Sequence, residues 1–230
     1  RFGPRGVIHS FPDGRITDTG PLTRKRMETI DEEVNVKAID FMERAKAANK
    51  PFFLWWNSTR MHIFTHLKAA SVGKTGLGVY PDGMVEHDGH VGEVLDKLKE
   101  LGLDENTIVM YSTDNGAESM SWPDGGTTMF RGEKNTNWEG GYRVPTLIRW
   151  PGVIKPGTVK NEMFASLDWV PTLVEIAGGP KGDALKQRVE AGYPGLVKTT
   201  LDGVNQIDYL SGKTEKSARD HFLYWSGTTP

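Results

Sequence analysis

The chain has 230 residues, of which 37% are hydrophobic and 25% charged, with seven tryptophans and a formal net charge of −2. This length and composition fit one large domain, or part of a larger one, with a real hydrophobic core. The small net charge gives no argument for nucleic acid or an anionic membrane surface, and no apolar run approaches the ~18 residues of a spanning helix.

Two amphipathic helices are predicted in the first half of the chain, after a Gly- and Pro-rich stretch over residues 1–22 that predicts loop with at most an edge strand. The first helix begins at Thr23, a suitable N-cap, and ends near residues 49–50. Its apolar residues recur at three- and four-residue steps: Met27, Ile30, Val34, Ala38, Phe41 and Met42. The second helix is expected over residues 82–101. Its expected buried face consists of Val85, Val91, Leu95 and Leu98.

Short apolar runs between and after these helices predict strands. The run at residues 52–56 is continuous and aromatic, which is typical of a strand buried on both faces. Further runs lie at residues 108–111, 145–150 and 221–225, and residues 164–177 indicate strand, turn and helix. This alternation predicts one domain over residues 1–230, a three-layer α/β/α sandwich around a mixed, mostly parallel sheet.

Polar residues follow two of these runs and form the candidate site. Asp114 and the side-chain oxygen of Asn115 come directly after the 108–111 run and are hard ligands suited to Ca²⁺ or Mg²⁺. Lys134 lies in the long loop that follows and offers a cation to an oxyanion. The end of the 52–56 run delivers Arg60, His62 and His66. In an open α/β sheet, sites form at the carboxyl ends of strands.

The motifs around these residues resemble the sulfatase family of the alkaline phosphatase-like superfamily. The segment STDNG is followed by FRGEKNTNWEGGYRVP and IRWPG, which is similar to the family's Asp-Asn-Gly strand end, Gly-Lys-x-Thr-x-Trp/Tyr-Glu-Gly-Gly-x-Arg-x-Pro loop and Trp-Pro-Gly strand end. Glu133 stands where a glycine is usual. The segment PFFLWWNSTRMHIF resembles the strand that leads to the family's active-site histidine, with Phe64 in place of the usual proline.

The resemblance implies an alkaline phosphatase-like fold and a sulfuric ester hydrolase of the arylsulfatase kind. Carried over to this sequence, the family's catalytic residues are His62 and Lys134, and its metal ligands are Asp114 and Asn115. The implied cofactor is Ca²⁺, with Mg²⁺ as an alternative, and the implied partner is a small-molecule sulfate ester. Bacterial members usually act in the periplasm or outside the cell, but the chain carries no address, and the natural substrate and oligomeric state stay open.

Two parts of the family pattern are missing. The family's nucleophile is a formylglycine made from a Cys/Ser-x-Pro-x-Arg motif, yet the chain has no cysteine. The nearest segment, residues 10–15, has its arginine one position late, and a Pro-Asp-Gly turn is the better interpretation. The family's N-terminal Asp pair and small C-terminal subdomain are also absent. The chain therefore resembles a middle-to-late segment of a longer protein, holding about half of the metal shell and inactive alone.

Alternative hypotheses remain beside this one. A two-metal phosphatase or phosphodiesterase of the superfamily would commonly place Asp-His, not Asp-Asn, at residues 114–115, whereas phosphonate monoester hydrolases share most of the pattern. A non-catalytic orphan fragment would explain the missing nucleophile. Residues 86–90 contain two acidic residues and two histidines, which invites a second metal hypothesis, although the family uses this helix for packing. Asp168 is predicted to be a structural or N-capping carboxylate.

Overall fold

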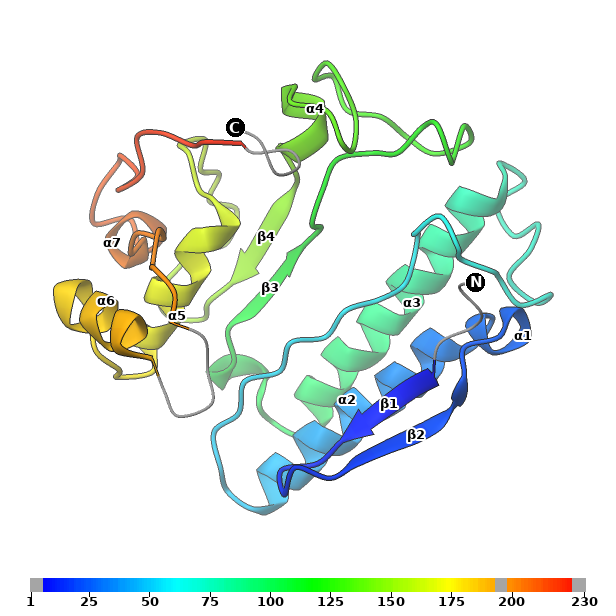
Figure 1. Ribbon diagram of the computed structural model, residues 1–230, viewed down its shortest axis with the longest axis horizontal. Helices are drawn as coiled ribbons and strands as arrows, with labels where there is room; N and C mark the ends of the chain where they lie inside the picture. Colours follow the sequence, from blue (N-terminus) through cyan, green and yellow to red (C-terminus); the bar gives the residue numbers. More distant parts are fainter. Residues whose placement is uncertain (1–5, 193–197, 225–230) are drawn as a thin grey trace. The chain divides into compact units, whose positions relative to one another are not determined.

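The structure is a computed structural model that describes residues 6–192 and 198–224. The chain forms two compact units (Figure 1). Unit 1 contains residues 1–107 and 113–145, and unit 2 contains residues 108–112 and 146–230. Because the two units are described separately, the prediction of a single domain stays a prediction. None of the helices in the described ranges is long and apolar enough to cross a membrane.

Unit 1 begins with an antiparallel hairpin of β1 (Gly6–Ser10) and β2 (Ile16–Pro21). The strands are joined at the Pro-Asp-Gly sequence, where the Phe11 amide donates to the Arg15 carbonyl at 2.9 Å and the Arg15 amide donates to the Asp13 carboxylate at 3.0 Å. The turn predicted for residues 10–15 is therefore confirmed, and the edge strand expected before it is one half of a hairpin.

The first predicted helix is divided in two. Thr23 caps α1 (Arg24–Met27), since its side chain accepts a hydrogen bond from the Arg26 amide at 3.2 Å. The longer helix α2 (Ile30–Ala47) follows after a break at residues 28–29. The prediction of one continuous helix was wrong at that break. Of the predicted core face, Met27, Ile30, Ala38 and Met42 are buried, and Val34 and Phe41 are half-buried.

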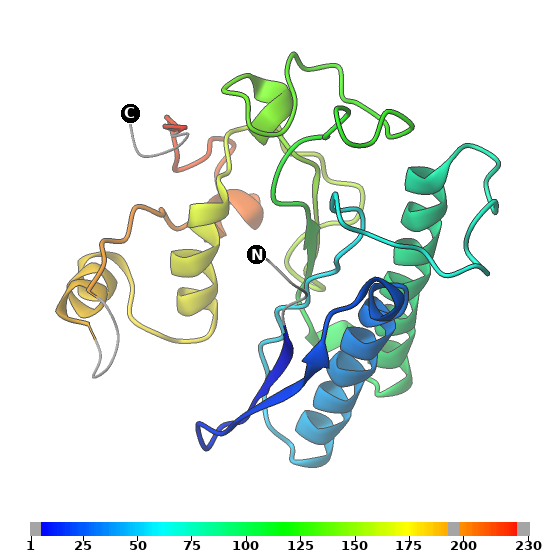
Figure 2. The same ribbon diagram turned by 45° about the vertical axis from the view of Figure 1, so that its right-hand side comes forward.

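Helix α3 (Val79–Glu100) packs beside α2, and both views show the two lying side by side (Figures 1 and 2). Polar links join them along their length: the Asn35 side chain donates to Glu93, and Lys97 pairs with Glu43 at 3.0 Å. Leu98 adds a buried apolar residue near the C-terminal end of α3.

The buried face of α3 is polar, which corrects the sequence prediction. Val85 is 48% exposed and Leu95 is 37% exposed, whereas the buried side chains of this helix are Asp82, Glu86, His87, His90 and Leu98. Asp82 accepts hydrogen bonds from the Gly73 and Thr75 amides and from the Thr75 hydroxyl. These bonds hold the pKa of Asp82 below its usual value and secure the loop before α3. A buried polar group is tolerated when such partners satisfy it.

The aromatic segment at residues 52–56 is not a strand in the described residues, contrary to the prediction. Its side chains alternate as a strand's would, with Phe53 67% and Trp55 77% exposed and their neighbours half-buried. A strand is defined by ladder hydrogen bonds to a neighbour, and no described segment pairs with this one. The sequence pattern indicated the local conformation but not the missing partner.

In unit 2, β3 (Val109–Ser112) pairs antiparallel with β4 (Thr146–Arg149), so two predicted strands are confirmed. The short helices η1 (Asp104–Asn106) and α4 (Glu139–Tyr142) belong to unit 1. Unit 2 continues with η2 (Ser166–Asp168), α5 (Trp169–Ile176), α6 (Gly182–Ala191) and α7 (Ile207–Leu210). The strands predicted near residue 164 and at residues 221–224 are absent from the described structure, and Trp225 lies outside the described residues.

Asp168 organises unit 2 from a fully buried position. Its carboxylate accepts hydrogen bonds from the Ala165 and Val204 amides, from the Gln206 side chain and from the Arg219 guanidinium, the last at 2.7 Å. Burial alone would raise the pKa of Asp168, but the hydrogen bonds from Arg219 and the other donors outweigh it, so the pKa lies below its usual value. The predicted structural role of this residue is confirmed, although the α5 cap itself involves no side-chain hydrogen bond from it.

Replacing Asp168 should destabilise unit 2 strongly. Asp168→Asn leaves the buried Arg219 without its counter-ion, and breaking such a pair costs about 3–5 kcal/mol. Asp208→Asn is the matched control, because the Asp208–Lys213 pair at 3.1 Å has side chains 63% and 70% exposed. The control should lose under about 1 kcal/mol. Denaturant unfolding measures both, and equal losses in the two variants would contradict the assigned role of Asp168.

The stability contributed by Asp168 should also depend on pH. Since the folded-state pKa is lowered, the contribution is present above the unfolded-state pKa and is lost as pH falls through the folded-state value. Stability curves of the wild type and Asp168→Asn should therefore converge at acid pH. A constant gap between the two curves down to the acid limit would show that ionisation of Asp168 is not the cause.

Candidate active site

The four residues predicted for the site, Asp114, Asn115, Lys134 and His62, all lie in unit 1. Asp114 and His62 are exposed, and Asn115 and Lys134 are half-buried. They come from two segments, the loop over residues 113–145 and the turn over residues 58–65.

Close glycine packing shapes the loop that carries Asp114 and Asn115. The Gly116 amide donates to the Gly141 carbonyl at 2.9 Å, and the Gly140 amide donates to the Arg131 carbonyl at 2.7 Å. A Cβ atom on Gly116 would collide with the Gly140 carbonyl oxygen. A side chain on Gly140 would collide with the carbonyl oxygens of Phe130, Arg131 and Gly132. The glycines at both ends of the motif are therefore required by backbone contact between the two ends of the loop.

Lys134 is fixed in the same loop. Its amide donates to the Ala117 carbonyl at 2.8 Å, which places its backbone beside the residues that follow Asp114 and Asn115. Its ammonium lies 3.5 Å from a carboxylate oxygen of Glu118, and the two side chains are 20% and 15% exposed. At that separation the pair is loose, so the ammonium remains able to approach another anion.

Asp114 and Asn115 offer oxygen atoms suited to a hard cation. The Asn115 amide nitrogen donates to the Gly116 carbonyl at 2.9 Å, which leaves the side-chain oxygen as the available ligand. Asp114 makes no hydrogen bond or ion pair with another described residue. Two oxygen donors fit Ca²⁺ as part of its coordination shell, since the ion prefers about 6–8 oxygen ligands. No cluster of three or more His, Cys, Asp and Glu side chains suited to a metal occurs among the described residues.

Glu133, which replaces the family's usual glycine, forms hydrogen bonds that stabilise the loop. Its carboxylate accepts hydrogen bonds from the Ser119 hydroxyl at 2.6 Å and from the Met120 amide at 3.3 Å. The Ser119 hydrogen bond, as the main cause, lowers the pKa of Glu133. This residue therefore ties the stretch after Asn115 to the stretch that bears Lys134.

His62 lies at the centre of two overlapping turns. Its amide donates to the Thr59 carbonyl at 2.9 Å, and its carbonyl accepts from the Thr65 amide at 2.9 Å. The imidazole contacts the Phe64 ring at a centroid distance of 6.1 Å and makes no hydrogen bond to a described residue. No hydrogen bond or ion pair in the described residues joins His62 to Asp114, Asn115 or Lys134.

Sequence reasoning placed Arg60 in this segment but assigned it no role, and it missed the acidic partners of Arg60. The Arg60 side chain is 0% exposed and forms ion pairs with Glu86 at 2.6 Å and Asp31 at 3.4 Å. The only signal in the sequence was an arginine two positions before the histidine. Its acidic partners are far away in the chain, so spacing could not identify them.

The second metal hypothesis, on α3, does not fit the observed contacts. Glu86 is the counter-ion of Arg60, and Asp88 is exposed, away from the buried Glu86, His87 and His90. Burial, as the largest cause, lowers the pKa of His87. The stacked rings of Trp56 and His87, 5.8 Å apart, indicate packing in place of ligation.

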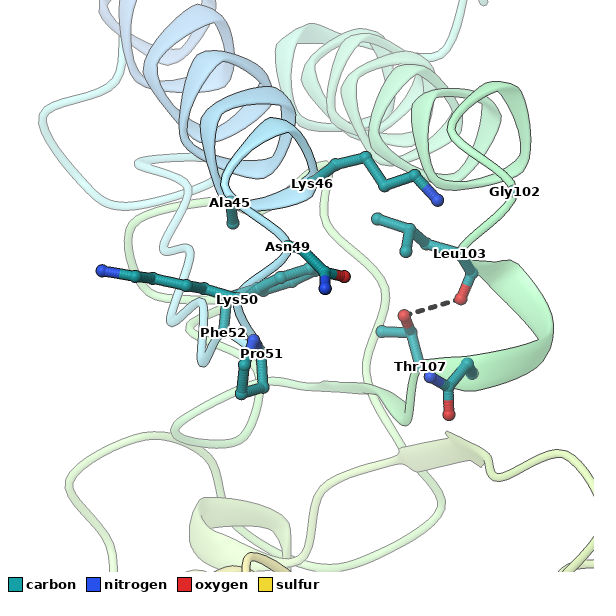
Figure 3. Close-up of a pocket in the computed structure, with 10 residues that line it drawn as sticks. Ala45, Lys46, Asn49, Lys50, Pro51, Phe52, Gly102, Leu103 and Thr107 are labelled. Atoms are coloured by element: carbon teal, nitrogen blue, oxygen red, sulfur yellow. Dashed lines mark hydrogen bonds between the residues drawn. The ribbon is translucent and has the colours of Figure 1, made fainter.

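A pocket of about 460 Å³ in unit 1 contains none of the four predicted residues. It lies where α2 and α3 end, and Figure 3 shows it lined by the two chain segments that follow these helices. Lys46 and Lys50 flank it, and the Thr107 hydroxyl donates to the Leu103 carbonyl at 2.7 Å. Its chemistry does not match the motifs above, so the candidate site is defined by the motifs and their loops.

Comparison with known proteins now decides the family. The sequence profile of the Sulfatase family matches residues 9–179, well over half of the chain. The chain belongs to the sulfatase family. Among curated relatives, human arylsulfatase A is 35% identical over 189 residues, which cover 82% of this chain and 34% of that protein. N-acetylgalactosamine-6-sulfatase of Canis lupus familiaris is 34% identical over 224 residues, covering 94% and 42%. The sulfatase chain thus spans roughly a third to two fifths of these relatives.

A solved structure supports the fold of this sulfatase chain. The PsFucS1 sulfatase from Pseudoalteromonas sp. superimposes with a TM-score of 0.83 at 29% identity, covering 97% of this chain and 42% of that one. The alkaline phosphatase-like α/β fold predicted from the motifs, in incomplete form, is therefore confirmed. Among the described residues the paired strands are β1 with β2 and β3 with β4, and both pairs are antiparallel.

Glycine packing in the site loop gives a direct test. Gly140→Ala should weaken the loop by about 1–3 kcal/mol, because backbone carbonyl oxygens cannot move aside as a flexible side chain can. Hydrogen exchange of the Gly116 and Lys134 amides should accelerate accordingly. Gly126→Ala, in the same loop with nothing within 4 Å of the added Cβ, should leave both rates unchanged. Equal exchange in the two variants would contradict the packing argument.

Proposed function

We propose that this chain supplies part of a metal-assisted site that hydrolyses sulfate esters. The observation that supports this most directly is the fixed loop of residues 113–145, in which the Asp114–Asn115 tip and Lys134 are held by the same backbone contacts. Sulfate ester hydrolysis spreads negative charge over the sulfate oxygens while an alkoxide or phenoxide departs. Preorganised cations stabilise such a transition state most effectively.

In this proposal each residue has a defined role. Asp114 and Asn115 hold Ca²⁺, with Mg²⁺ as the alternative, through their side-chain oxygens. A divalent cation bound there would polarise the sulfate oxygens. Lys134 leaves Glu118 to bind the sulfate or the leaving oxygen, and His62 hydrogen-bonds to or protonates the leaving oxygen. The formylglycine nucleophile and the remaining metal ligands come from parts of the parent protein outside these 230 residues, so the isolated chain does not turn over substrate.

Substitution of Lys134 and His62 tests the assignment in the intact natural protein. Lys134→Ala and His62→Ala should each reduce kcat for an aryl sulfate by about 10²–10³-fold, the usual cost of removing one charge-stabilising group. Lys213→Ala, which removes an exposed lysine of unit 2, should leave kcat unchanged. Wild-type-like turnover in Lys134→Ala would remove that residue from the reaction.

Metal dependence and ester preference complete the test. Chelation should abolish turnover and Ca²⁺ should restore it, and Asp114→Ala should raise the Ca²⁺ concentration required. Among matched sulfate, phosphate and phosphonate esters, the sulfate ester should be hydrolysed at the highest rate. A preference for the phosphonate would assign the chain to a phosphonate monoester hydrolase instead, and metal-dependent turnover by the isolated 230-residue chain would refute its predicted inactivity.

A further inference from the structure

The His62 turn rests on a buried charge cluster that no part of the proposed mechanism uses. Arg60, Asp31 and Glu86 have side chains that are 0%, 1% and 4% exposed. Two carboxylates and one guanidinium removed from water require close mutual pairing, because an unpaired buried charge costs several kcal/mol. Their positions are therefore tightly constrained.

The Arg60 side chain interacts with three helices near the turn. Its guanidinium donates to Glu86 from two nitrogens, at 2.6 and 3.1 Å. It also donates to the main-chain carbonyls of Met27 and Glu28, at the end of α1, at 3.5 and 3.3 Å. A single side chain thus joins the turn to α1 and α3, and through Asp31 to α2.

Asp31 holds the start of the same turn. One of its oxygens accepts from the Thr59 amide and the other from the Ser58 hydroxyl, both at 2.9 Å. The Ser58 oxygen in turn accepts from the Arg60 amide at 3.0 Å. At the other end, the Thr65 hydroxyl donates to the Thr59 carbonyl at 2.9 Å and closes the turn over His62.

Helix α3 packs against this turn without spare room. A Cβ on Gly83 would meet the side chains of Met61 and Leu67. Met61 lies between Arg60 and His62 in the chain, so the helix contacts the turn through both the Glu86 ion pair and this close approach. The His62 imidazole has no hydrogen bond of its own to a described residue, so its position depends on the backbone of the turn and on the contact with the Phe64 ring.

We infer that Arg60 is a positioning residue for His62, holding the turn of residues 58–65 against α2 and α3 through Asp31 and Glu86. This inference rests on the proposed role of His62 in sulfate ester hydrolysis. A lysine cannot replace Arg60, since a single ammonium lacks the planar set of donors that reaches Glu86, Met27 and Glu28 together.

Activity of the intact natural protein gives the first measurement. Arg60→Lys should lower kcat for an aryl sulfate about 10–100-fold with KM nearly unchanged, because a shift of about 1 Å in a reacting group costs on that order. Thr65→Val, a milder and nearly isosteric change, should lower kcat in the same direction. The matched controls are Arg219→Lys and Thr172→Val, which alter a buried Arg–carboxylate pair and a buried threonine hydrogen bond in unit 2. Their kcat should stay within about twofold, measured well below the melting temperature of each variant.

A double-mutant cycle separates positioning from general stability. If Arg60 acts through His62, then Arg60→Lys should cost almost nothing further in a protein that already carries His62→Ala. A full additional loss in that background, or unchanged kcat in Arg60→Lys alone, would overturn the inference and leave Arg60 a purely structural residue.

Hydrogen exchange tests the effect of Arg60 on the turn without relying on enzyme activity. The His62 and Thr65 amides should exchange at least about tenfold faster in Arg60→Lys and should be unchanged in Arg219→Lys. If the wild-type protein hydrolyses no sulfate ester, the proposed function fails, yet faster exchange still supports the hold of Arg60 on the turn. Unchanged exchange in Arg60→Lys overturns the positioning inference whatever the activity.

Discussion

Pairing of the buried Arg60 with Asp31 and Glu86 is the interaction on which the arrangement of unit 1 depends. Apolar packing tolerates small shifts, but buried charges do not, because separation exposes each to an environment that cannot solvate it. The guanidinium pairs with both carboxylates and donates to two carbonyl groups at the end of α1. The consequence is that two helices and one turn meet at a fixed point, and the turn carries the histidine that the family motif assigns to the active site.

Helix α3 connects this point with the rest of the candidate site. At its first turn, the Tyr80 amide donates to the Asp124 carboxylate at 2.8 Å, and the Tyr80 and Trp122 rings contact each other edge-on. Figures 1 and 2 both show the loop of residues 113–138 near this end of α3. Glu86, which holds Arg60, follows Tyr80 by six residues, or about 9 Å along the helix. One rigid helix therefore supports both segments that bear predicted site residues, although they are far apart in the chain.

How much the sequence could predict depended on whether the cause was local. The Pro-Asp-Gly turn, the Thr23 cap and the core face of α2 follow from near neighbours and were predicted correctly. The buried face of α3 was predicted wrongly because hydrophobic periodicity cannot register that Glu86 is neutralised by an arginine 26 residues away. The segment at residues 52–56 failed as a strand for a related reason, since a ladder requires a partner that periodicity does not contain. Within the candidate site, the motifs predicted Asp114, Asn115, Lys134 and His62, but they gave no role to Arg60 and did not indicate what secures the loop.

The departures from the family pattern show which motif positions are fixed by packing and which by chemistry. Gly116 and Gly140 have no space for a side chain, so the backbone requires them whatever the reaction. Glu133, in place of a glycine, fits because its carboxylate turns toward Ser119 and Met120 and strengthens the same loop. Lys134 differs from all of these: among the described residues its ammonium pairs loosely with Glu118 alone, at 3.5 Å, although its backbone is firmly bound. A rigid backbone beneath a weakly held charge is an arrangement suited to binding an anion, and in the proposed function Lys134 exchanges Glu118 for the anionic substrate while the loop stays in place.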